Sequence, residues 1–164
     1  MNIAPWQTPA YQHHAQFLWQ SFHDWTGRWL IPDLADSWPR LSPLDQATAL
    51  FEYPQPILSH GGQPDPIFNY GNQASLKLWE ISWDELVQMP SHLSAEPPAQ
   101  SERANLLRQA AAQGVIEHYR GIRISRTGQR FEIINATIWT VLDSHNQNIG
   151  QAATFNQWEY LEEK

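Results

Sequence analysis

Cysteine is absent from the 164-residue chain. This absence excludes disulfides, zinc sites built on thiolates, and any flavin or other chromophore linked through a cysteine sulfur. Residues 1–9 lack the basic segment and apolar run of a secretory signal, and no apolar run is long enough to span a bilayer. We therefore expect a cytoplasmic protein that has no membrane partner.

Basic residues are also scarce. Lysine and arginine together number 10 against 17 acidic residues, and the formal net charge is -7. Nucleic acids and anionic membranes are bound through clustered basic side chains that displace counterions. The composition therefore predicts no nucleic-acid partner.

Enzyme signatures are missing as well. The chain contains no Gly-x-Ser-x-Gly, no phosphate-binding Gly-rich loop, no Gly-x-Gly-x-x-Gly and no His-Glu-x-x-His. His13, His14 and His23 could share part of a helical face, but no carboxylates join them at the spacing of metal ligands. We predict neither catalytic residues nor a metal site.

Tryptophan, in contrast, is plentiful, with nine residues. Apolar side chains recur near the N-terminus at steps of three and four, which predicts one face of a helix. They are Tyr11, Ala15, Leu18, Phe22, Trp25 and Trp29. We assign residues 1–41 to an N-terminal helical arm. Phe22, Trp25 and Trp29 are expected to be buried on the chain's own core, with a homodimer or another protein partner as the alternative.

Residues 42–164 form the main domain in this interpretation. Helix starts are predicted at Ser42, Asn72 and Ser82, each a side chain that caps a helix N-terminus. A longer helix over 101–113 ends at Gly114. Alternating patterns predict strands over 57–60, 67–70, 115–125, 130–142 and 148–158. The fold class is therefore α/β of the α+β kind, with the last three strands in an antiparallel meander.

Several short segments of this sequence resemble those of a known protein family. They include Leu58-Ser59-His60-Gly61, the run from Asp65 to Asn72, and Gly150-Gln151-Ala152-Ala153-Thr154-Phe155. In this order the chain resembles the MEKHLA domain in its free-standing bacterial or cyanobacterial form, over residues 17–158. The resemblance implies a PAS-like five-stranded antiparallel sheet, with short helices on one face, and a sensory role. No homeodomain or zipper precedes the domain, so DNA binding is not implied.

PAS relatives suggest flavin or haem as cofactors. The lack of cysteine excludes a flavin–thiol adduct. Haem is disfavoured because helix 101–113 contains no histidine, although His92 lies before it and His118 after it. Noncovalent flavin stays open.

A pocket for a planar small molecule is expected between Trp79 and the meander strands. Asn135 and Trp139 share one parity on their strand, and Gln151 and Phe155 share one parity on the next. Two amides and two aromatic rings suit a planar polar ligand.

Two further candidates depend on the regularity of the strand over 115–125. Regular alternation would turn His118 and Arg120 inward, toward an acidic ligand. A bulge at Gly121 would turn both outward. The sequence thus favours a non-enzymatic sensory or ligand-binding domain that signals through protein contact. A structural dimerisation module with a filled core is the alternative, and a small enzyme ranks third.

Overall fold

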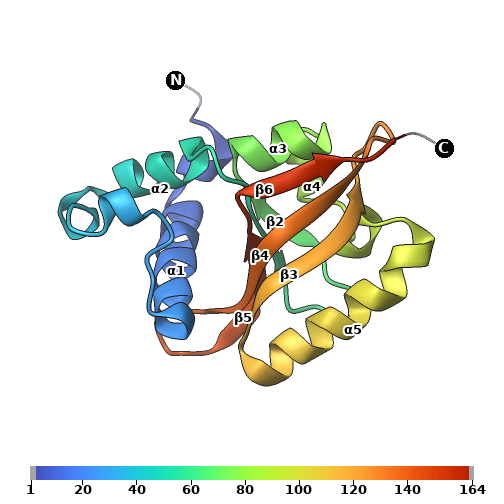
Figure 1. Ribbon diagram of the computed structural model, residues 1–164. Coiled ribbons are helices and arrows are strands. Elements are labelled where there is room, and N and C mark those ends of the chain that lie inside the picture. The colour runs from blue at the N-terminus through green and yellow to red at the C-terminus, as the bar shows by residue number, and fades with distance from the viewer. Residues whose placement is uncertain (1–2, 163–164) are drawn as a thin grey trace.

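One antiparallel sheet forms the centre of the computed structural model, which describes residues 3–162 (Figure 1). Five α-helices surround the sheet: α1 (Pro9–Thr26), α2 (Pro43–Glu52), α3 (Gln73–Trp79), α4 (Trp83–Leu86) and α5 (Pro97–Gln113). The strands are β1 (Ile57–Gly61), β2 (Phe68–Gly71), β3 (Val115–Ile124), β4 (Arg130–Leu142), β5 (Asn148–Thr154) and β6 (Gln157–Tyr160).

The strand order is β2-β1-β5-β4-β3, and β6 also pairs with β4. β5 pairs with residues 137–142 of β4, whereas β6 pairs with residues 131–134. The two strands therefore share one edge of β4. The single strand predicted over 148–158 is wrong in this respect, because Phe155 and Asn156 interrupt it.

The predicted helix caps are confirmed. The Ser42 hydroxyl accepts from the Asp45 amide at 3.1 Å, and the Asn72 side chain accepts from the Ser75 amide at 3.2 Å. Ser82 heads a capping box at the start of α4. Gly114 ends α5 with φ +87°, and α5 begins four residues earlier than predicted, at Pro97.

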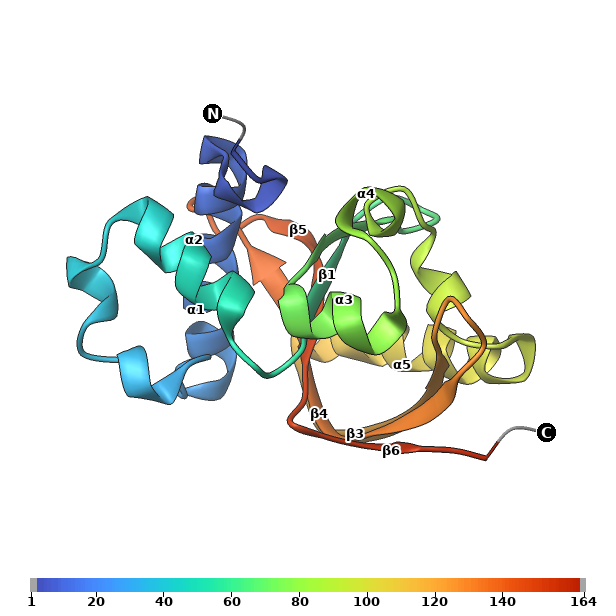
Figure 2. The same ribbon diagram turned by 90° about the horizontal axis from the view of Figure 1, so that it is seen from above.

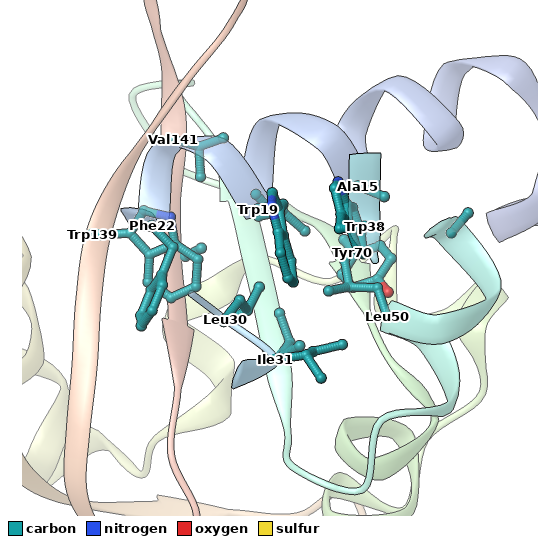
Figure 3. Close-up of a cluster of buried hydrophobic side chains, with 14 residues drawn as sticks. Ala15, Trp19, Phe22, Leu30, Ile31, Trp38, Leu50, Tyr70, Trp139 and Val141 are labelled. Atoms are coloured by element: carbon teal, nitrogen blue, oxygen red, sulfur yellow. The ribbon is translucent and has the colours of Figure 1, made fainter. Parts of the chain in front are cut away.

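Helices cover both faces of the sheet (Figure 2). The outer face packs against α1 and α2, and the inner face packs against α3, α4 and α5. On the outer face, Trp19 stacks on Trp38 with ring centroids 3.9 Å apart. Phe22 meets Trp139 of β4 edge-on at 5.0 Å (Figure 3). The Trp139 indole donates to the Ser21 hydroxyl at 3.0 Å.

The N-terminal stripe therefore packs on the chain's own sheet. Phe22 is 3% exposed, as predicted, and Trp29 is partly buried. Trp25 is 37% exposed, more than predicted, but its indole donates to the Thr140 carbonyl at 2.9 Å. The apolar face of α1 is thus covered by the chain's own core, and not by a second subunit or another protein, which was the alternative.

Two complementary bulges invert the faces of β3 and β4. Between the pairs Ile116–Ile138 and Tyr119–Ala136, β3 advances by three residues and β4 by two. Between Tyr119–Ala136 and Gly121–Ile133, β3 advances by two and β4 by three. The register is thus restored after each strand has gained one residue.

This inversion corrects the predicted faces of β4. Phe131 and Ile133 belong to the inner cluster, whereas Trp139 and Val141 belong to the outer one. Regular alternation along residues 130–142, as the sequence predicts, would instead place all four on one face. The extra residue is Asn135, whose φ of 56° lies in the left-handed region that asparagine adopts more readily than most residues.

Candidate functional site: a cationic cavity under the sheet

A small cavity lies between the inner face of the sheet and the helices that cover it. It offers about 60 Å³ to the centres of water-sized molecules, which is room for a few waters or one ligand of a few heavy atoms. Most of its wall is apolar. The apolar side chains are Leu58, Phe68, Trp79, Leu107, Ile133, Ile138, Ala152, Ala153 and Phe155.

Two arginines reach this cavity from different elements. Arg103 of α5 is 7% exposed and Arg123 of β3 is 5% exposed. Arg123 donates to the Ile122 carbonyl at 2.8 Å and to the Tyr119 hydroxyl at 3.2 Å. That hydroxyl in turn donates to Glu102 at 3.0 Å. Arg123 is thus linked to a carboxylate through one bridging hydroxyl.

Arg103 differs from Arg123 in having no partner within the part of the chain that the structure describes. Among residues 3–162 it makes no hydrogen bond and no ion pair. Burial, and then the charge of Arg123, lower the pKa of the Arg103 guanidinium to about 10. The side chain therefore remains a cation at neutral pH, in surroundings that are mainly apolar.

His60 of β1 and Trp79 of α3 bring two further polar groups to the cavity wall. The Nδ1 of His60 lies 2.9 Å from the Gly61 carbonyl, so it carries the proton and Nε2 is an acceptor. Burial is the main cause that lowers the pKa of His60, and the charge of Arg103 adds to it. Within the described residues, His60 Nε2 and the Trp79 indole Nε1 are buried without a hydrogen-bond partner.

Gln151 of β5 also belongs to the polar part of the wall, together with Ser59 and Ser94. It is 8% exposed, and its Nε2 donates to the Leu107 carbonyl of α5 at 2.9 Å. This bond ties the sheet to the helix that carries Arg103. The cavity is therefore held between fixed elements.

Of the residues predicted to bind a ligand, the cavity includes Trp79, Gln151 and Phe155. Trp139 lies on the other face of the sheet, in the outer cluster. Asn135 is exposed and does not line the cavity. The prediction that Asn135 and Trp139 line the inner pocket is wrong, because the bulge at Asn135 changes the parity of β4.

His118 and Arg120 both lie outside the cavity. His118 is exposed, with φ 59°, and its Nδ1 lies 2.7 Å from Asn135 Oδ1. Arg120 is exposed and pairs with Glu132 at 2.9 Å. Of the two placements left open by the sequence, the outward one is confirmed, although the bulge is centred on His118 and not on Gly121.

An outer cleft lies on the opposite side of the sheet, where Arg28 and Trp29 of the arm approach His118 and Asn135. Phe155 borders both this cleft and the inner cavity. It sits at the break between β5 and β6. Phe155 is thus the side chain that separates the two spaces.

The sequence analysis did not predict that His60, Arg103 and Arg123 line the cavity. Two signals could have found the arginines. Arg103 has the three- and seven-residue helical spacing to Leu106 and Ala110, both buried, so it lies on the apolar face of α5. Once the bulge is placed, Arg123 shares the inward parity of Tyr119.

The remaining cofactor question concerns flavin. Pockets for ligands of that size typically measure about 300–1,000 Å³. The inner cavity is far smaller at about 60 Å³, so the residues that line it do not fit a three-ring flavin. In the part of the chain from 3 to 162, no three metal-ligating side chains are grouped to hold a metal. None of its helices is long and apolar enough to cross a membrane.

Comparisons with known proteins agree with this architecture. The MEKHLA domain family model matches residues 12–160, and no curated protein matches. The PAS domain of a Colwellia psychrerythraea protein superimposes with a TM-score of 0.60 at 16% identity, covering 69% of this chain and 93% of that one. A light-oxygen-voltage domain studied with a flavin analogue gives 0.56 at 15% identity, covering 73% and 86%. The light-state dimer of the fungal photoreceptor Vivid gives 0.51 at 17%, covering 65% and 79%. At these identities the likeness concerns the fold.

Proposed function

The chain belongs to the MEKHLA domain family and has a PAS-like fold, and from this we propose that it is a sensory domain that binds a small molecule in the inner cavity. In this proposal the domain has no catalytic role. It reports the bound molecule to a protein partner through its surface.

One observation carries the proposal: polar groups that have no hydrogen-bond partner among residues 3–162 lie around a cavity whose wall is mainly apolar. His60 Nε2 and Trp79 Nε1 are buried without a partner among the described residues, and Arg103, 7% exposed, forms no hydrogen bond or ion pair with them. An unpaired buried polar group costs about 1–3 kcal/mol, and native proteins contain few of them. A ligand that pairs with these groups explains why the chain retains them.

The cavity also limits the size of the ligand. Space for a few water-sized molecules suits a compound of a few heavy atoms. A planar ligand as large as a flavin is excluded from it by this volume. The proposed ligand is therefore a small metabolite.

Phe155 provides a route from the cavity to the surface. Its ring is 2% exposed, borders both the cavity and the outer cleft, and directly precedes the exposed Asn156. A ligand that displaces this ring would alter the β5–β6 junction. The outer cleft is where a partner would detect the change.

The experiment compares two alanine-to-leucine variants by thermal unfolding. Ala153→Leu adds volume inside the cavity, and Ala112→Leu adds the same atoms on the exposed side of α5. The probes are propionate, propionamide and propylammonium. The concentration of each probe is raised to as much as 50 times the dissociation constant fitted from its titration. Because a ligand that binds only the folded state stabilises it, at least one probe should raise the Tm of the wild type and of Ala112→Leu. It should not raise the Tm of Ala153→Leu. The proposal fails if no probe raises the Tm, or if Ala153→Leu responds as the wild type does.

A further inference from the structure

The charge balance of the cavity indicates the class of ligand. The side chains that line it include two cationic arginines and no aspartate or glutamate, and the lowered pKa of His60 keeps that imidazole neutral at neutral pH. Arg123 reaches Glu102 only through the Tyr119 hydroxyl. Arg103 reaches no carboxylate among residues 3–162. Buried charges in proteins are normally paired, so a negative partner is missing from this site.

Arg103 cannot remove this imbalance by losing its proton. A guanidinium stays protonated in proteins, and here its pKa remains near 10 despite burial. Arg123 lies close enough for its charge to disfavour the Arg103 cation. An anion in the cavity would pair with the Arg103 cation and would also offset the repulsion between Arg103 and Arg123.

The shape of the wall narrows the choice of anion. A guanidinium presents a planar fork of donors that matches the two oxygens of a carboxylate. The rest of the wall is mostly apolar, with Leu58, Phe68 and Ile138 among its residues. A phosphate needs donors on several sides, whereas a short hydrocarbon group suits these apolar side chains.

We infer that the cavity binds a short monocarboxylate of about two to four carbons, with its carboxylate on Arg103 and its hydrocarbon group against the apolar wall. This inference rests on the proposed function and names the ligand class of the same site.

The test is calorimetric titration of the full chain in a buffer free of carboxylates and phosphate. Propionate is compared with propionamide, which has nearly the same shape and no charge, and with inorganic phosphate. The variant is Arg103→Met, and the control is Arg108→Gln, an exposed arginine of the same helix. We expect propionate to bind at least tenfold more tightly than propionamide or phosphate. Arg103→Met should weaken propionate at least tenfold, and Arg108→Gln should not change it.

A second measurement separates a ligand-binding role for Arg103 from a structural one. Without ligand, Arg103→Met removes an unpaired buried charge, so its Tm should equal or exceed that of the wild type. A structural role would instead lower the Tm. A lower Tm for Arg103→Met in ligand-free buffer overturns the inference.

The two proposals fail in different ways. If propionamide or phosphate binds as tightly as propionate, or Arg103→Met retains propionate, the ligand class is wrong while the binding function stands. If no probe binds, or if Ala153→Leu responds to the probes as the wild type does, both proposals are wrong.

Discussion

His118 and Asn135 face each other across β3 and β4, both with left-handed backbone, at φ 59° and 56°. The Nδ1 of His118 lies 2.7 Å from Asn135 Oδ1. Each residue sits at the bulge of its strand, and together the bulges change which side chains face the cavity. This pair therefore decides that Arg123 points inward and Arg120 outward.

The left-handed conformation at Asn135 predicts a specific mutational pattern. Asn135→Val should destabilise the domain by about 1–2 kcal/mol, because a β-branched residue is strained at positive φ. Asn135→Gly relieves that strain and should cost less than Asn135→Val. Urea unfolding of the two variants measures the difference. Equal stabilities would show that the backbone at this position does not require the left-handed region.

The outer core predicts a large effect at Phe22. Phe22→Ala should cost about 3–5 kcal/mol, because the ring is 3% exposed and packs on Trp139. Leu44→Ala, at a 42% exposed position of α2, should change stability by less than about 0.5 kcal/mol. Chemical denaturation compares the two. A small effect at Phe22 would mean that the arm does not contribute to the folded core.

His14 predicts a loss of stability in acid. Its Nε2 lies 2.8 Å from the Ser59 hydroxyl, and burial lowers its pKa from 6.5 to about 4. Above pH 6.5 both folded and unfolded states hold a neutral imidazole. Between pH 6.5 and 4 only the unfolded state takes up the proton, so stability falls by up to about 3 kcal/mol.

The matched variants for this prediction are His14→Gln and His13→Gln, the latter at an exposed neighbour. Unfolding free energies are measured from pH 7 to pH 4. His14→Gln should remove part of the decline with falling pH, whereas His13→Gln should keep it. An unchanged pH profile for His14→Gln would contradict the assignment.

Absorption spectroscopy tests the cofactor prediction. With no cysteine in the chain and a cavity of about 60 Å³, the purified protein should lack a flavin band, and blue light should produce no adduct. A flavin spectrum that survives gel filtration would show that the cavity opens far beyond its observed size.

The sequence predicted much of the local structure, because caps and alternation are short-range signals. Ser42, Asn72 and Gly114 each mark a helix end as expected. These short-range signals could not predict which residues of β4 face inward, because the one extra residue at Asn135 moves every later side chain of the strand to the opposite face of the sheet. Arg103 and His60 come together only through the sheet, across about forty residues of chain.

The indole N–H signal of Trp79 in a ¹⁵N–¹H NMR spectrum tests the central claim most directly. Trp79 lines the cavity and its Nε1 lacks a partner among the described residues, whereas the Trp139 indole is bonded to Ser21 on the other face. On titration with propionate, the account predicts a saturable shift of the Trp79 signal and little change at Trp139. If neither propionate nor propionamide moves the Trp79 signal, or if both indoles shift alike, the cavity is not a ligand site.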